Sequence, residues 1–206
     1  VKNATATNTL ISFDTAAPQV SITTSSSTLL ISETATITFT LTETPTTNLF
    51  EQTDITISGG GSFTSSLTAV TSTTFTIEYT PPSCASASIT ISVNEDAFTD
   101  AFGNSNTSSQ TIISVNTYPI APTITVSPTT LPSPLYTDVD VELTANTLSN
   151  WFIGSTQIAT NTLSLIVSST GEYYAYGYDS GTGCVGPSSN VVSLTCIDLP
   201  QIQGPD

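Results

Sequence analysis

The chain has 206 residues, sixteen of which are Asp or Glu, and its single basic residue, Lys2, leaves a formal net charge of −15. Without Arg and with one Lys it cannot neutralise nucleic-acid phosphates or an anionic membrane surface, so we expect neither as a partner. It contains no His and no apolar run near 18 residues, which removes the commonest general base and any membrane-spanning helix from the expected features.

A repeated segment marks the beginning of the chain. Residues 9–15 read TLISFDT, and residues 111–117 read TIISVNT. The second copy follows a run of alternating segments, as the last strand of a domain would. We therefore interpret residues 1–13 as the last strand of a preceding domain, most of which lies outside this chain.

Alternation of apolar residues with Thr or Ser dominates residues 14–117. The segment TATITFTL places Ala35, Ile37, Phe39 and Leu41 on one face of a strand and Thr on the other. This period of two, interrupted by Gly, Pro, Asn and Ser clusters, predicts a β-sandwich. Strands are expected at 18–23, 34–42, 53–58, 63–69, 73–80, 87–93 and 109–115.

The second half repeats the organisation with different strands. The segment NTYPIAPTI has the character of the earlier DTAAPQV, and Pro favours an extended linker in both. Trp151 is expected in the core, and Gly171 with Tyr173 predicts a tyrosine corner, as in immunoglobulin-like (Ig-like) sandwiches. Strands are expected at 139–144, 150–154, 162–169, 171–179 and 190–196. The chain is thus predicted to be all-β, with tandem Ig-like sandwiches at 14–117 and 118–197 joined by short Pro-containing linkers, and with 198–206 leading to a following domain.

Two sets of motifs resemble known families. The segments FDTAAPQVSI, SETATITFTLTE and VNEDAFTDAFGNSN resemble the bacterial Ig-like repeats of giant cell-surface adhesins. The family's fingerprints stand here as Asp14-Thr15-Ala16-Ala17-Pro18 and Asp100-Ala101-Phe102-Gly103-Asn104. The second half, with WFIGSTQIATNTLSL and GEYYAYGY, is similar to Ig-like modules that occur in arrays in large secreted bacterial proteins. The resemblance implies an extracellular, cell-surface location and a calcium ion at the linker, with Asp14 and Asp100 at the matching positions.

Acidic residues of the first domain are expected to meet at one end of the sandwich, because the loops that follow the strands at 34–42 and 87–93 lie where the chain enters. Six to eight hard oxygen ligands are what Ca²⁺ takes in proteins. The alternative is that these residues are solvated turn formers, since Asp, Asn and Gly are ordinary loop residues. The candidate calcium ligands are Asp14, Glu43, Asp96, Asp100 and Asn104, with a weaker pair, Asp138 and Asp198, at the far end of the second domain.

Outward tyrosines form a second candidate site. If Tyr173 points inward, then Tyr174, Tyr176 and Tyr178 alternate outward on the same strand. Such a stripe can stack on sugar rings or pack against a neighbouring chain. It can also serve only to pair side chains across the sheet, which is the interpretation we favour together with a protein neighbour.

The three cysteines are too few for a disulfide-dense scaffold. Cys184 is expected in the loop before the last strand, and Cys196 at the opposite end of that strand. Seven residues at ~3.3 Å each separate these ends by about 20 Å, which exceeds disulfide reach. We therefore predict no bridge between Cys184 and Cys196.

These patterns predict a protein that is not an enzyme but a structural spacer of a large extracellular bacterial adhesin or surface appendage. Its expected partners are neighbouring Ig-like domains of the same chain and, in a filament, copies of itself. The alternatives are a glycan- or protein-binding module that uses the outward tyrosines, and a segment of a multi-chain extracellular filament.

Overall fold

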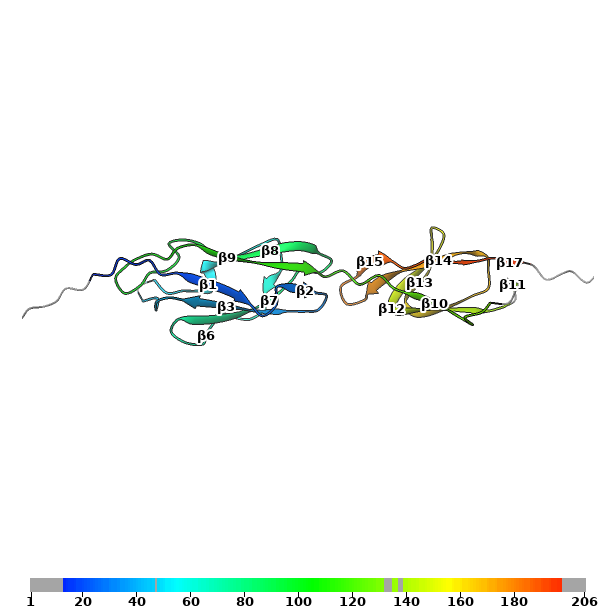
Figure 1. The fold of residues 1–206 in the computed structure, drawn as a ribbon, viewed down its shortest axis with the longest axis horizontal. Coiled ribbons are helices and arrows are strands. Elements are labelled where there is room, and N and C mark those ends of the chain that lie inside the picture. The colour runs from blue at the N-terminus through cyan, green and yellow to red at the C-terminus, as the bar shows by residue number, and fades with distance from the viewer. Residues whose placement is uncertain (1–12, 47, 132–134, 137–138, 198–206) are drawn as a thin grey trace, which may run out of the picture. The chain divides into compact units, whose positions relative to one another are not determined.

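The structure is a computed structural model that describes residues 13–46, 48–131, 135–136 and 139–197 (Figure 1). The strand expected at 1–13 therefore lies outside the described residues, except for the exposed Phe13, and so does the linker expected at 198–206. The chain divides into two compact units. The first runs to Pro82 and resumes at Ser86–Asn116, and the second contains Ser83–Ala85 and the residues from Thr117 onward. No helix in the described part of the chain is long and apolar enough to cross a membrane.

One sheet of the first unit is built around strand β3 (Ala35–Leu41), which lies between β1 (Val20–Thr24) and β7 (Thr74–Thr80). All three run antiparallel, and β7 also pairs with two short strands, β5 (Ser62–Phe63) and β6 (Thr68–Ala69). The expected alternation in β3 is confirmed, since its four apolar side chains are at most 3% exposed.

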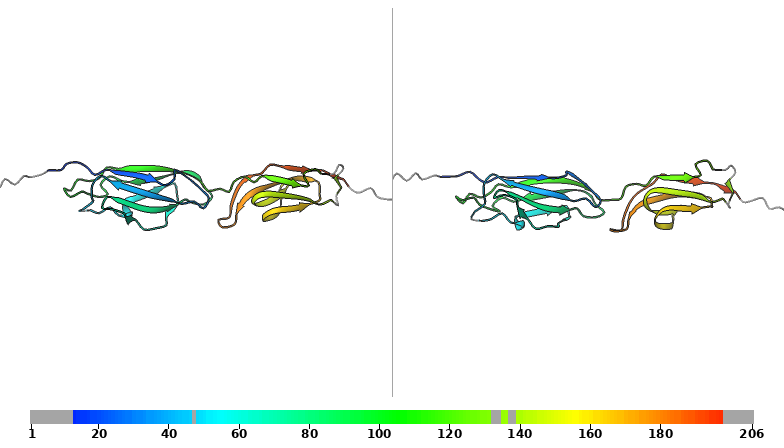
Figure 2. Two further views of the ribbon diagram at one scale, coloured as in Figure 1. Left: turned by 60° about the horizontal axis from the view of Figure 1, so that its bottom comes forward. Right: turned by 90° about the horizontal axis from the view of Figure 1, so that it is seen from below.

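The other sheet of the first unit has the order β2-β9-β8-β4. Its central hairpin joins β8 (Ser86–Val93) to β9 (Ser109–Asn116), and β4 (Ile55–Ser58) pairs with β8. One strand was not anticipated: β2 (Thr28–Leu30), which pairs with β9 in parallel. A three-residue 3₁₀ helix, η1 (Gln52–Asp54), precedes β4. The apolar residues of β8 face inward, so the core lies between the two sheets. The two views in Figure 2 show the strands of this unit from two further sides.

The chain enters and leaves the first unit at opposite ends. The backbone N–H of Thr107, just before β9, donates to the carbonyl of Pro18 (3.0 Å), so the chain enters beside the beginning of β9. It leaves at the end of β9, at Asn116. Eight residues at ~3.3 Å each carry it about 26 Å across the unit.

The second unit is organised by a long bent hairpin. Strand β12 (Val141–Ile153) pairs along its length with β13 (Thr156–Val167), with register shifts between Thr144 and Phe152. The first part of β12 also pairs with β10 (Ile124–Ser127), and its last part with β14 (Gly171–Asp179). The segments predicted as separate strands at 139–144 and 150–154 are therefore one continuous strand with an irregular middle. Strands β15 (Cys184–Ser188) and β16 (Val192–Leu194) pair with β14, and β17 (Cys196–Ile197) pairs in parallel with β11 (Leu135–Tyr136).

The core of the second unit confirms two sequence predictions. Trp151 is fully buried, and its indole N–H donates to the carbonyl of Thr162 (3.1 Å). Tyr173 is 1% exposed, and its hydroxyl donates to the carbonyl of Ser169 (2.9 Å), which closes the tyrosine corner. Ala175, two residues along β14, is also fully buried.

The beginning of the second unit is held against β14 and β15. A Cβ atom added to Gly177 or Gly186 would overlap the carbonyls of Ile120 and Pro119 respectively, so these glycines permit a close backbone approach. The region predicted as a free Pro-containing linker is therefore partly packed into the second unit. Asn190, just before β16, is tied to the beginning of β10, because its side-chain amide accepts from the N–H (2.8 Å) and donates to the carbonyl (3.2 Å) of Ile124.

A disulfide joins Cys84 and Cys184. Cys84 belongs to the segment Ser83–Ala85, which lies between β7 and β8 in sequence but clusters with the second unit. Cys196 is a free thiol. The prediction of no Cys184–Cys196 bridge is confirmed, whereas the sequence did not reveal the partner of Cys184.

Candidate metal centre

Three carboxylates far apart in sequence meet at the end of the first unit where the chain enters. Asp14 lies in the entering segment, Glu43 follows β3, and Asp100 lies between β8 and β9. One oxygen from each lies within 4.8 Å of the others. The entering segment and the β8–β9 connection are seen at the same end of the unit in Figure 1. Asp100 is 1% exposed, and the other two are half-buried.

Backbone contacts lock the loop after β3 to the β8–β9 connection. The N–H of Thr46 donates to the carbonyl of Thr99 (3.1 Å), and the N–H of Thr99 donates to the carbonyl of Asn48 (3.2 Å). The side-chain amide of Asn48 donates to the carbonyl of Ala97 (2.6 Å). Below these loops, the Phe50 ring contacts Phe39, Phe75 and Phe98 at centroid distances of 5.2–5.5 Å. The two acidic loops are therefore hydrogen-bonded to each other and pack over a cluster of aromatic rings.

The fingerprint Asp100-Ala101-Phe102-Gly103-Asn104 folds into a turn around its own aspartate. Asp100 Oδ1 accepts the N–H groups of Phe102 and Asn104, both at 2.8 Å. The Asn104 amide Nδ2 donates to Asp100 Oδ2 (2.8 Å) and to the carbonyl of Asp14 (3.1 Å). Asn104 thus ties the turn to the entering segment through its side-chain amide.

Electrostatics show that the three carboxylates repel one another. Desolvation by burial, followed by the charges of Asp14 and Asp100 and a hydrogen bond with Asp100, raises the pKa of Glu43 above its usual 4.5. Desolvation by burial also acts to raise the pKa of Asp100, but the hydrogen bonds from Asn104, Phe102 and Gly103 together hold it below its usual value. The hydrogen bonds thus favour the charged form of Asp100, while burial and the neighbouring charges disfavour the charged form of Glu43.

The donor set fits a hard divalent cation. All three side chains offer oxygen, which is the ligand atom of Ca²⁺. The sequence has no basic residue other than Lys2, so apart from Lys2 no side chain can neutralise the cluster. Of the five predicted ligands, the structure brings together Asp14, Glu43 and Asp100, and Asn104 supports them. Asp96 lies outside the group, as an exposed residue with φ of 60° in the turn after β8. Asp138 and Asp198 fall outside the described residues.

The predicted tyrosine site has a different character. Tyr174 and Tyr176 stand half-buried on the outer face of β14, where they meet Phe152 of β12. Phe152 stacks on Tyr174 (5.5 Å, 9° between planes) and meets Tyr176 edge-on (5.4 Å). The Tyr174 hydroxyl donates to the carbonyl of Gly154 (2.7 Å). The rings therefore largely satisfy one another, and Tyr178, further along β14, is not among these ring contacts.

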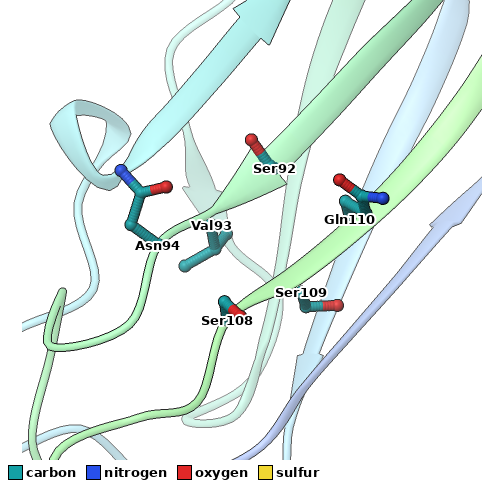
Figure 3. Close-up of a pocket in the computed structure, with 6 residues that line it drawn as sticks. All are labelled: Ser92, Val93, Asn94, Ser108, Ser109 and Gln110. Atoms are coloured by element: carbon teal, nitrogen blue, oxygen red, sulfur yellow. The ribbon is translucent and has the colours of Figure 1, made fainter.

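Other polar features of the first unit are structural. A hollow of about 470 Å³ lies at the end of the β8–β9 hairpin where the connection between the two strands begins. It is lined by uncharged side chains, as Figure 3 shows: Ser92, Val93, Asn94, Ser108, Ser109 and Gln110. Asn106 heads a glycosylation sequon, but it is 2% exposed. Its amide accepts from Phe98 N–H (2.9 Å) and donates to the carbonyl of Asn94 (2.8 Å), so it is an organiser of the loop.

Several known proteins show similarity to this chain. Solved structures that resemble the chain include domains A168–A170 of titin (12% identity, TM-score 0.34, covering 89% of this chain and 67% of that one). They also include the Yersinia pseudotuberculosis adhesin InvE (14% identity, TM-score 0.35, covering 85% and 58%). A third is the N-terminal part of the bacterial S-layer protein SbsC (13% identity, TM-score 0.33, covering 87% and 44%).

No curated protein matches the chain. Residues 14–117, just over half of the chain and the segment that carries the acidic cluster, match the family model for a bacterial Ig-like domain. The chain therefore belongs to the bacterial Ig-like domain family.

Proposed function

We propose that this chain is a non-catalytic spacer segment of a large extracellular bacterial adhesin or surface appendage. The observation that carries the proposal is the path of the chain through each unit. In the first unit the chain enters beside the start of β9 and leaves at its end. In the second, Asn190 ties the first strand to the beginning of the last segment, so the chain again leaves at the opposite end. Each sandwich therefore adds the length of one folded domain to the distance that the chain spans.

Two further observations support this role. The sequence has no His, no Arg and one Lys, so acid–base chemistry would have to rest mainly on carboxylates and tyrosines, without the commonest general base. The Cys84–Cys184 disulfide suits an oxidising compartment such as the bacterial cell exterior. An extracellular location is thus supported by chemistry that is independent of the family match.

Calcium is the proposed stiffening element. A cation bound by Asp14, Glu43 and Asp100 would tie the entering segment to two loops of the first unit, which otherwise hold three repelling carboxylates together. Binding to the folded state stabilises by ligand linkage, about 2.7 kcal/mol at a hundredfold excess of calcium over Kd.

Thermal unfolding tests the calcium proposal. The full chain is expected to melt higher in calcium than in chelator, and Asp100→Ala is expected to remove most of that difference. Asp96→Ala, outside the cluster, is the matched control and should keep it. An unchanged melting temperature on chelation of the wild-type chain would show that these are only solvated loop acids.

The spacer role is tested separately, against the glycan-binding alternative that the half-buried outer rings of Phe152, Tyr174 and Tyr176 suggest. The chain is expected to bind no sugar on a glycan array, whereas tight binding that Tyr176→Ala abolishes would replace the spacer role with recognition.

In the parent protein, exchanging the segment for an unrelated Ig-like pair of equal length should preserve surface attachment, and deleting it should weaken attachment. Sedimentation of the isolated chain should give a monomer, and self-assembly would favour the filament alternative.

A further inference from the structure

The Cys84–Cys184 disulfide closes a very large loop in the chain. The two residues are 100 positions apart, so 99 residues, 85–183, lie between them. Those residues contain β8 and β9 of the first unit and β10 to β14 of the second. The residues outside the loop contain β1 to β7 on one side and β15 to β17 on the other.

The segment that bears Cys84 is built into the second unit by several contacts. The N–H of Ala85 donates to Thr117 Oγ1 (2.9 Å), and the N–H of Thr117 donates to the carbonyl of Ala85 (2.8 Å). Thr117 is 2% exposed and Cys184 is 1% exposed. The Thr182 hydroxyl donates to the sulfur of Cys184 (2.9 Å). Cys84 itself has φ of 54°, a left-handed conformation that non-glycine residues adopt at a cost. The fold therefore holds this loop in a specific position for the bridge.

We propose that the bridge is a mechanical shortcut, through which tension on the two ends of the chain passes from Cys84 directly to Cys184 and bypasses residues 85–183. The proposal rests on the spacer function, because a spacer between an attachment site and a cell is pulled at its ends. The disulfide and the 99-residue loop connect the same two residues, and the disulfide is by far the shorter connection. The disulfide therefore bears the tension, and the loop is not stretched until that bond breaks.

The consequences differ between the two units. In the second unit, tension can extract only β15, β16 and β17, while β10, β12, β13 and β14 stay off the path. These protected strands carry Trp151 and Tyr173 of the core. In the first unit β1 to β7 lie on the path, and they must separate from β8 and β9, to which β4 and β2 are paired. The bridge thus limits how far the segment can lengthen under load. It keeps most of the core strands of the second unit off the path of tension, although β16 takes Leu194 of the core with it.

Single-molecule stretching of the full chain, held at its two termini, tests the proposal. With the bridge intact, complete extension is expected to fall short of that of the reduced chain by the length of 99 residues, about 330–360 Å. Reduction uses dithiothreitol, whose two thiols exchange with the bridge to give two protein thiols and the cyclic disulfide of the reagent. Cys84→Ser should give the longer extension without reductant.

Two controls make the outcome decisive. Cys196→Ser keeps the bridge and should keep the short extension. If Cys84→Ser fails to fold, reduced wild type supplies the same comparison. Thiol counting on denatured, unreduced protein should find one reactive cysteine, and finding three would overturn the bridge itself. One reactive cysteine together with equal extensions before and after reduction would overturn the shortcut. None of these readouts depends on attachment to cells, so the spacer function and the shortcut can fail independently.

Discussion

At the scale of single residues, Gly61 carries a sharp backbone constraint in the first unit. Its φ is 85°, and an added Cβ would overlap the Tyr79 hydroxyl and the carbonyl of Thr80. Tyr79 is fully buried and donates to the carbonyl of Gly60 (3.0 Å), so it cannot easily withdraw. We expect Gly61→Ala to lower the free energy of unfolding by about 2–3 kcal/mol. Gly103→Ala is the matched control, because it has the same φ of 85° but nothing within 4 Å of the added Cβ. It should cost only about 1 kcal/mol in chelator. Equal losses in urea unfolding of the two variants would contradict the steric argument.

Glu43 provides the second prediction at this scale. Since burial and the neighbouring charges raise its pKa above 4.5, the folded protein holds this proton more tightly than the unfolded chain. The corresponding stability is present below about pH 4.5 and is lost as the pH rises through the raised folded value. In chelator, Glu43→Gln is therefore expected to raise the melting temperature at pH 7 and to flatten its fall above pH 4.5. In calcium the same variant should lose part of the calcium response. Glu95→Gln, an exposed acid in the turn after β8, is the control, and a like response from both variants would show a general charge effect.

At the scale of elements, strand β14 separates two kinds of tyrosine by its alternation. Tyr173 points inward and its hydroxyl holds the carbonyl of Ser169, whereas Tyr174 points outward and bonds the exposed Gly154. Losing a buried hydrogen bond costs more than losing an exposed one, because water replaces only the latter. We expect Tyr173→Phe to cost about 1–3 kcal/mol. Tyr174→Phe should cost below about 1 kcal/mol in the same urea titration. A larger loss for Tyr174→Phe would mean that the outer aromatic group stabilises the sheet more than the corner does.

The same alternation explains how much of the fold could be predicted. Strands such as β3, β7 and β8 are buried on one face, so their period of two gave boundaries within one residue of the observed ones. Strand β2, at three residues, is too short to show a period. Strand β12 was divided in two because its bulged middle breaks the alternation that defines a strand.

The candidate metal centre followed in part from the same topology. Loops that share an end of a sandwich could be inferred, and Asp14, Glu43 and Asp100 do converge. The sequence could not show that Asp96 lies outside this group, because the direction of its side chain depends on the local backbone, which has a φ of 60° at Asp96. Nor could it pair Cys84 with Cys184, since that bond depends on Ser83–Ala85 clustering with the second unit. Cys184, which the sequence placed in a loop, is the first residue of β15.

At the scale of the whole molecule, the excess of negative charge destabilises the folded state. Sixteen acids and one Lys leave a net charge of −15, so the folded state concentrates like charges that the unfolded chain spreads apart. Raising sodium chloride from about 10 mM to about 500 mM shortens the screening length from about 30 Å to below 8 Å. In chelator at pH 7 the melting temperature is therefore expected to rise with salt, and at pH 3, where the carboxylates are mostly protonated, the rise should shrink. Calcium chloride at matched ionic strength should raise it further in the wild-type chain and no further than sodium chloride in Asp100→Ala. A salt response that persists undiminished at pH 3 would mean that salt acts on apolar burial, and the carboxylate repulsion would then not be what limits stability.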